Sequence, residues 1–134
     1  MNCFARFAFC LQALLLISGC ADLVVTSVGD RPFVAARLMM TATIKNEGWT
    51  DAPPSTTTVE VKTPTSPSFT QVATTPTPAL NRGQQIVLDL WPFHPAALVP
   101  TGACFDARVC ADSTNAVFEG WLWEDNCRIK SFCN

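Results

Sequence analysis

Two cysteine-bounded segments near the C-terminus decide the fold class of this chain: CFDARVC, residues 104–110, and CRIKSFC, residues 127–133. In the first segment the apolar residues Phe105, Ala107 and Val109 alternate with polar ones, which is the period-two pattern of a strand with one buried face. Both cysteines of that segment then lie on the opposite face. The second segment has the same cysteine spacing, so we expect two β-strands of equal length.

The spacing also predicts how the four cysteines pair. Two cysteines six positions apart in one strand are about 20 Å from each other, whereas a disulfide requires Cα atoms within roughly 7 Å. In an antiparallel pair the residue numbers of opposite partners have a constant sum, and one sum serves both Cys110 with Cys127 and Cys104 with Cys133. We therefore favour these two nested disulfides over the crossed alternative, each contributing ~3 kcal/mol by restricting the unfolded chain.

The second segment departs from an ideal strand. If its cysteines point outward, Arg128, Lys130 and Phe132 point inward, which is tolerable only at the edge of a sheet. We therefore expect a short edge strand or a β-bulge over residues 127–133. A zinc site formed by the four thiolates is disfavoured, because the spacing lacks the close CxxC pairs of structural zinc sites.

Further strands follow from the same alternation earlier in the chain. The clearest is residues 37–45, with Leu38, Met40, Ala42 and Ile44 on one face; residues 23–28, 57–62 and 86–90 are also predicted strands. Turns are expected at residues 46–48 (Asn-Glu-Gly) and 81–83 (Asn-Arg-Gly), where Asn and Gly tolerate positive φ.

Two proline-rich stretches separate these strands. The chain is too short for two cores, so residues 63–78 are expected to form a loop or irregular edge strand instead of a linker. Residues 91–101 contain three prolines, which exclude a central strand and favour a crossover between sheets. Six to seven strands in about 115 residues indicate an all-β, immunoglobulin-like sandwich.

The N-terminal segment has a different character. Arg6 is the only charge in residues 1–19, and the apolar run 7–17 is shorter than the roughly 20 residues that span a bilayer. It ends in Ile17-Ser18-Gly19-Cys20, which resembles a bacterial lipobox. We expect residues 1–19 to be a lipoprotein signal peptide and Cys20 to carry a lipid; a docked helix and plain secretion are the alternatives.

Export has two consequences. It places the chain in an oxidising compartment, where the last four cysteines can pair. The residues that follow Cys20, Ala21 and Asp22, resemble those of lipoproteins sent to the outer membrane in cells that have one. The expected location is therefore the cell envelope, with the membrane contacted through the lipid anchor.

The charge distribution excludes one class of partner. The 134 residues carry a formal net charge of −2, with lysines and arginines scattered along the chain. No basic face is expected to release counterions from a phosphate backbone, so we expect no binding to nucleic acid.

Several stretches together resemble the CARDB family of bacterial modules, named for a suspected role in cell adhesion. They are ADLVVTSV (21–28), TATIKNEGWTDAP (41–53), LNRGQQIVLDL (80–90) and ARVCADSTNAVFEGWLWEDN (107–126). The positions that match the family pattern are Asp22, Leu23, Asn46, Gly48, Asp112, Asn115, Glu119 and Asn126. The resemblance implies a domain over residues 20–134 with an immunoglobulin or fibronectin type III-like sandwich fold and a role in adhesion. The four cysteines and the aromatic residues near position 121 depart from the family pattern.

Few residues of this chain are candidates for catalysis or metal binding. The single histidine, His94, lies between Phe93 and Pro95 without a nucleophile motif, so a structural role is expected and no catalytic residue is predicted. Asp112, Asn115 and Glu119 could supply oxygen ligands to calcium, although they do not follow the EF-hand spacing. We favour the alternative that Asp112 and Asn115 accept backbone hydrogen bonds that order the loop, with no metal or cofactor besides the lipid.

Three tryptophans are candidate partner-binding residues. Trp121 and Trp123 would share one face if extended, and Trp49 lies in another loop. Packing against the domain is the base expectation. The alternative is an exposed aromatic patch that binds sugar rings or a partner protein.

The sequence therefore predicts a non-enzymatic, lipid-anchored binding or adhesion module of the cell envelope, whose partner is an envelope or surface protein or a glycan. Two alternatives stay open. The first is a glycan-binding protein that uses Trp121 and Trp123. The second is an inhibitor or accessory subunit that presents the loop 111–126 to a partner protein.

Overall fold

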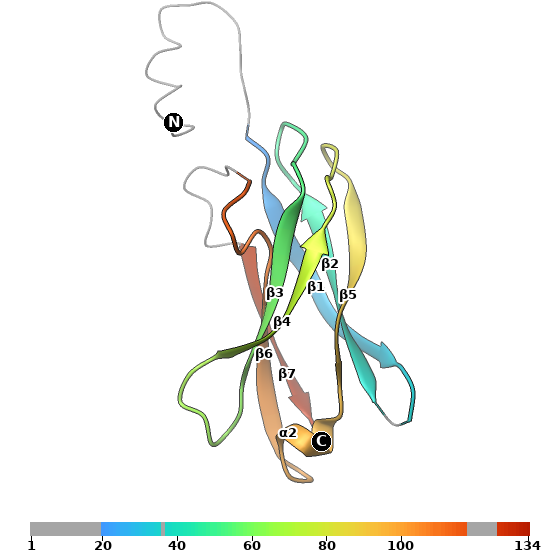
Figure 1. The fold of residues 1–134 in the computed structure, drawn as a ribbon, viewed down its shortest axis with the longest axis vertical. Helices are drawn as coiled ribbons and strands as arrows, with labels where there is room; N and C mark the ends of the chain where they lie inside the picture. Colours follow the sequence, from blue (N-terminus) through green and yellow to red (C-terminus); the bar gives the residue numbers. More distant parts are fainter. Residues whose placement is uncertain (1–19, 36, 118–125) are drawn as a thin grey trace, which may run out of the picture.

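The computed structural model describes residues 20–35, 37–117 and 126–134. Within these ranges the chain forms seven strands and one short helix (Figure 1). In chain order they are β1 (Leu23–Pro32), β2 (Leu38–Asn46), β3 (Ser55–Lys62), β4 (Thr70–Thr77), β5 (Gln85–Phe93), α2 (Pro95–Leu98), β6 (Cys104–Cys110) and β7 (Cys127–Cys133).

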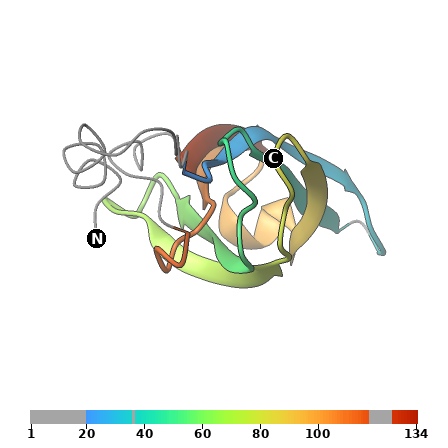
Figure 2. The same ribbon diagram turned by 90° about the horizontal axis from the view of Figure 1, so that it is seen from above.

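The strands form two antiparallel sheets that face each other. One sheet has the order β1-β2-β5 and the other the order β4-β3-β6-β7. Figure 2, which looks along the length of the strands, shows the two sheets curving around a common interior. The all-β sandwich predicted from the alternating segments is confirmed.

The core lies between the sheets and is formed by the alternate residues that the sequence pattern identified. Met40, Ala42 and Ile44 of β2 are buried, as are Val59 and Val61 of β3. At the end of the sandwich remote from Cys20, the core closes with three phenylalanine rings. Phe93 contacts Phe105 and Phe132 edge-on, and each pair of centroids is 5.5 Å apart, a favoured aromatic geometry.

The pairing of β6 with β7 follows the predicted register without interruption from one end to the other. Cys104 lies opposite Cys133 and Cys110 opposite Cys127. Both pairs are bonded, with Cα–Cα distances of 4.0 Å. The nested disulfides are therefore confirmed.

Strand β7 is an edge strand, as predicted, but the bulge that we allowed as an alternative is absent because its register with β6 is regular. Of its seven residues only Phe132 is buried. Arg128 and Lys130 avoid the core because β7 lies at the margin of the sandwich, where Arg128 donates from Nη1 to the Thr26 carbonyl of β1 (2.6 Å). The two disulfides thus fasten a strand that makes little contact with the core.

The first proline-rich stretch agrees with its prediction and the second does not. Residues 70–77 form the edge strand β4, as predicted. The second stretch was wrongly predicted to leave the sheet at Trp91, because β5 continues through Pro92 to Phe93. Proline is accepted there because β5 lies at the edge of its sheet, where one side of the strand needs no donor. The crossover to β6 begins only after Phe93 and contains α2.

In the part of the chain that the structure describes, no helix is both long enough and apolar enough to cross a bilayer.

Candidate functional site

The chain enters the sandwich at one end, formed by residues 20–22, 46–52 and 80–84, which we call the Cys20 end. The Cys20 carbonyl accepts a hydrogen bond from the Trp49 N–H (2.9 Å), and the Asp22 carbonyl accepts one from the Glu47 N–H (2.8 Å). Ala21, between them, is buried in the core. The main chain is therefore fixed to the domain from Cys20 onward, before β1 begins.

Gly48 allows this close approach of two backbones. A Cβ atom at position 48 would lie 2.5 Å from the Asp22 nitrogen and closer still to the Cys20 carbonyl oxygen. The sequence-based explanation, a turn in which Asn46 and Gly48 tolerate positive φ, is wrong, because neither residue has positive φ. The glycine is required by lack of space. At the second predicted turn the explanation is correct, since Gly83 has φ of 75°.

Asn46 connects the segments that form this end. Its side chain is fully buried, and its Oδ1 accepts hydrogen bonds from the N–H groups of Asp22 (3.1 Å) and Gly48 (3.0 Å). Its Nδ2 donates to the carbonyls of Thr50 (2.8 Å) and Leu80 (3.1 Å). All four hydrogen-bonding positions of the amide are used, as a buried polar group requires. The sequence carried a signal for this role that we missed: Asn46 continues the inward-facing alternation of β2.

Trp49 projects from the Cys20 end into solvent. Its exposed fraction is 68%, so of the three candidate tryptophans this one is a surface residue. The Arg82 guanidinium lies over the indole ring, 4.6 Å from its centroid, a cation–π arrangement. The Arg82 N–H donates to Asp51 Oδ1 (2.9 Å), which joins the two loops. Trp121 and Trp123 lie outside the described residues.

Cys20 is disulfide-bonded in this structure. A sulfur in a disulfide cannot also carry a thioether-linked lipid, so the predicted acylation requires Cys20 in its reduced form. The predicted signal peptide, residues 1–19, lies outside the described residues, and its removal and the lipidation of Cys20 stay predictions.

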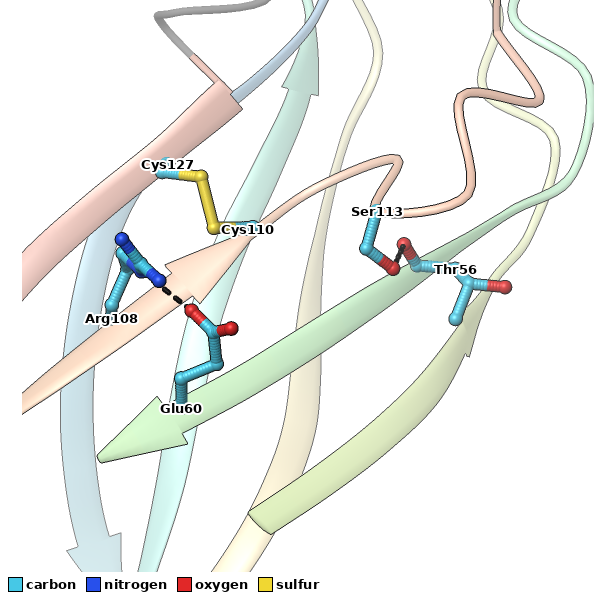
Figure 3. The surroundings of a disulfide bond; sticks show 6 residues. All are labelled: Thr56, Glu60, Arg108, Cys110, Ser113 and Cys127. Carbon is cyan, nitrogen blue, oxygen red and sulfur yellow. Dashed lines mark hydrogen bonds and ion pairs between the residues drawn. A yellow bond between two sulfur atoms is a disulfide. The ribbon is translucent and has the colours of Figure 1, made fainter. Parts of the chain in front are cut away.

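A polar groove of about 620 Å³ lies on the outer face of the four-stranded sheet. Two of its lining residues form an ion pair: Glu60 Oε2 accepts a hydrogen bond from Arg108 Nε (2.5 Å), beside the Cys110–Cys127 disulfide (Figure 3). The Arg108 guanidinium also lies 4.4 Å from the centroid of the Phe69 ring. Threonines and a glutamine form much of the remaining wall: Thr56, Thr58, Thr74 and Gln71. We refer to this feature as the polar groove.

The polar groove was not predicted from the sequence, because the residues that line it come from four different strands and a loop. The alternation does place Glu60 and Arg108 on outward-facing positions of their strands. It does not reveal that β3 pairs with β6 so that the two residues lie directly opposite each other. Opposite charges at such positions attract, but the pairing of two strands separated by more than 40 residues is a tertiary feature.

The loop that follows β6 closes one end of the polar groove and is held to the sheet. Ser113 donates to the Thr56 carbonyl through its N–H (2.9 Å) and its hydroxyl (3.1 Å), as Figure 3 shows for the hydroxyl. The Asp112 carboxylate accepts hydrogen bonds from the N–H groups of Ala116 (2.8 Å) and Val117 (2.9 Å). Burial raises the pKa of the Asp112 carboxyl above its usual 3.8, while those two hydrogen bonds lower it.

These contacts bear on the predicted calcium ligands. Asp112 uses both carboxylate oxygens within the loop, which is the structural role that we favoured. Asn115 contributes its backbone, which donates to the Asp112 carbonyl (2.8 Å) at a φ of 52°. Glu119 lies outside the described residues. Among residues 20–35, 37–117 and 126–134, no three His, Cys, Asp or Glu side chains lie close enough together to hold a metal ion.

His94 occupies the N-terminal boundary of α2, where its backbone is extended. Its carbonyl accepts a hydrogen bond from the Ala97 N–H (2.9 Å), so the residue takes part in the first turn of the helix. The polar groove and the Cys20 end lie on other elements, and neither has the histidine among its residues.

Solved structures with the same fold were found. A CARDB domain from Pyrococcus furiosus, crystallised in complex with di-metal ions, superposes with a TM-score of 0.63 at 15% identity, covering 90% of this chain and 93% of that one. β-Glucosidase 3B from Thermotoga neapolitana (TM-score 0.53, 18% identity) matches 85% of this chain but 17% of the enzyme. A β-glucosidase from Kluyveromyces marxianus (TM-score 0.53, 12% identity) matches 96% of this chain and 16% of the enzyme. At these identities the matches describe the fold alone.

The sequence was also compared with protein families and with curated proteins. No curated protein matches the chain. The family model for CARDB matches residues 20–128, which is most of the chain and includes both the Cys20 end and the polar groove. This chain therefore belongs to the CARDB family.

Proposed function

We propose that this protein is an exported, lipid-anchored and non-enzymatic binding module of the bacterial cell envelope. The CARDB domain supports a binding role. The two disulfides support export, because such bonds persist in oxidising compartments. Cys20 is the proposed site of the lipid, and residues 1–19 are the proposed signal peptide.

One observation carries this proposal: the match to the family model starts at the residue that the lipobox-like sequence marks as the new N-terminus. The family match begins at residue 20. Among the described residues, Cys20 already contacts the sandwich, because its carbonyl accepts a hydrogen bond from the Trp49 N–H. Cleavage before Cys20 would therefore leave all seven described strands in the mature chain, with the lipid on a residue that is hydrogen-bonded to the sandwich.

Lipidation is tested in cells that express the full-length chain. Incorporation of radiolabelled palmitate is expected for the wild type and is expected to be lost in Cys20→Ala, because the Cys20 sulfur is the atom to which the lipid is attached. Cys104→Ala/Cys133→Ala is the matched control, since it removes two cysteines but keeps Cys20. Label that persists in Cys20→Ala, or no label in the wild type, would contradict the lipid anchor.

The polar groove is the surface that we propose for the partner. Its volume lies within the range of ligand sites, and its charged and hydroxyl groups face outward from a sheet in which two disulfides join β6 to β7. A partner that hydrogen-bonds to Glu60, Arg108 and the threonines is the chemistry that this surface favours. The partner would be an envelope or surface protein or a glycan.

Two matched arginine substitutions test the location of the partner surface. Thr74→Arg places a long charged side chain in the polar groove, and Val87→Arg places the same side chain on the outer face of the other sheet; both positions are exposed. After crosslinking in intact cells and purification of the protein, the partner is expected to be lost only in Thr74→Arg. Equal recovery from both variants would exclude the groove.

A glycan is the second candidate, and the hydroxyl and amide lining of the polar groove favours it. A glycan array probed with the purified protein distinguishes the two. Sugar-specific binding that Thr74→Arg removes supports the glycan, whereas a stoichiometric crosslinked protein supports a protein partner.

A further inference from the structure

We infer that the Cys20 end of the domain rests on the phospholipid surface, with the Trp49 indole and the Arg82 guanidinium in the headgroup layer. This inference rests on the proposed lipidation of Cys20. It goes beyond the anchor itself, because it specifies which face of the domain the membrane contacts and which face is left for a partner.

The first argument is the short distance between the anchor and the domain. The Cys20 carbonyl is hydrogen-bonded to the Trp49 N–H (2.9 Å), and Ala21 is buried. Gly48 packs so closely against residues 20–22 that it leaves no room for a side chain. No flexible segment therefore separates the lipidated residue from the sandwich. Acyl chains on the Cys20 sulfur would hold this end at the headgroup layer, which is about 5–7 Å deep on each side of the hydrocarbon core.

The second argument is the chemistry of the exposed groups at that end. Tryptophan is enriched at membrane–water interfaces, because its ring is apolar and its indole N–H remains a donor. Trp49 is the most exposed large apolar residue in the described part of the chain, at 68%. Arg82 lies over its ring and can donate to a lipid phosphate from there, because a guanidinium binds phosphate through several N–H groups.

The charge of the same end selects the type of lipid surface. Lys45 is paired with Glu47, with 2.9 Å between Nζ and Oε1, and Asp51 accepts the N–H of Arg82. Asp22 at the same end adds a third carboxylate, so these two cations and three carboxylates leave a formal charge of −1. The end is therefore suited to zwitterionic phospholipid headgroups, and a preference for anionic lipid is not expected.

The opposite end supplies a matched control. Phe33 and Val34, in the β1–β2 connection, are also large exposed apolar residues, at 49% and 64%. They follow the ten-residue strand β1, so roughly 30 Å separates them from the Cys20 end. Figure 1 shows this connection at the end of the sandwich remote from the start of β1. With Cys20 anchored, Phe33 lies at the end of the sandwich remote from the membrane.

Photo-crosslinking in cells tests the inference on the full-length chain. Trp49→p-benzoylphenylalanine and Phe33→p-benzoylphenylalanine are expressed in cells whose phospholipids carry radiolabel, and the cells are irradiated. A phospholipid adduct is expected at position 49, at least about fivefold above that at position 33. Comparable adducts at both positions, or a protein adduct alone at position 49, would overturn the inference.

Palmitate labelling of the same two variants separates this inference from the proposed function. Palmitate at Cys20 without a lipid adduct at position 49 would refute the orientation and leave the anchor standing. An absence of both signals would refute the anchor and the orientation together. Trp49→Phe keeps an aromatic ring of similar exposure, and an unchanged melting temperature in that variant confirms that position 49 tolerates substitution without loss of the fold.

Discussion

The Cys110–Cys127 disulfide allows a quantitative test of how β7 is held to the sandwich. This strand buries one side chain, Phe132, whereas a central strand such as β3 buries five of its eight. Burial of one phenylalanine contributes about 2–3 kcal/mol. Ordering seven residues costs more than that, at about 1–2 kcal/mol per residue for the backbone alone. Backbone hydrogen bonds to β6 offset part of the difference, and we expect the disulfides to supply the rest.

The expected contribution of each disulfide to the free energy of unfolding follows from the length of the loop that it closes. Cys110 and Cys127 are 17 positions apart, and restriction of a loop of that size in the unfolded chain is worth about 3 kcal/mol. Cys104 and Cys133 are 29 positions apart. With the inner disulfide present, however, the outer one closes only the remaining residues, so it also contributes about 3 kcal/mol.

Urea unfolding of Cys110→Ala/Cys127→Ala is expected to show a free energy of unfolding about 2–3 kcal/mol below that of the wild type. For a domain of this size the melting temperature is expected to fall by roughly 8–12 °C. Removal of both disulfides is expected to cost about 6 kcal/mol and to abolish amide-exchange protection in β7 before the other strands lose theirs.

Reductant provides the control. The reduced wild type should be as stable as the reduced variant in which Cys104, Cys110, Cys127 and Cys133 are all replaced by Ala. Comparison of that variant with and without reductant measures any contribution from the disulfide at Cys20. Stability that is unchanged in Cys110→Ala/Cys127→Ala would refute the reasoning, because it would mean that β7 is held by packing and hydrogen bonds alone.

Three further substitutions test the Cys20 end and the loop after β6. Asn46→Ala leaves the backbone groups around it without partners in the interior and is expected to lower the free energy of unfolding by about 2–4 kcal/mol, measured by urea unfolding; a loss below about 0.5 kcal/mol would show that water replaces the amide. Gly48→Ala forces a methyl group against residues 20–22 and is expected to cost about 1–3 kcal/mol and to increase amide exchange in that segment, whereas unchanged exchange would contradict the close approach. Burial raises the native-state pKa of Asp112 above 3.8, so ionisation of this carboxyl disfavours the native state. The contribution of Asp112 to the free energy of unfolding is therefore greatest below pH 3.8 and falls as the pH rises towards the raised native-state pKa. The stability of the wild type relative to Asp112→Asn should therefore fall as the pH increases from about 4 to 7, and a rise over that range would reverse the assigned sign.

The local sequence was enough to predict most of the strands. Alternation along β2, β3 and β6 named the buried residues correctly, because a strand places successive side chains on opposite faces whatever the rest of the chain does. The equal spacing of the cysteines predicted the register of β6 with β7, since one alignment satisfies both disulfides. The prediction was wrong at the end of β5. Pro92 was assigned to a crossover because its tolerance within β5 depends on that strand being at an edge, which no local pattern reveals.

The candidate site was harder to predict from the sequence. The turn at Asn46 and Gly48 was located correctly but explained by the wrong cause, because the need for glycine comes from the backbone of residues 20–22, distant in sequence. The polar groove was missed for a related reason. Its residues become neighbours only when β3 pairs with both β4 and β6.

What the sequence determined by itself is therefore the class of fold, the inward and outward faces of each strand and the pairing of four cysteines, all of which follow from short-range periodicity and spacing. Tertiary structure alone decided that Asn46 joins three segments, that Glu60 meets Arg108, and that Trp49 lies beside Cys20. These contacts join residues that the chain separates by 24 positions or more. The pairing of β1 with β2 and of β3 with β6, which local periodicity does not specify, brings them within hydrogen-bonding distance.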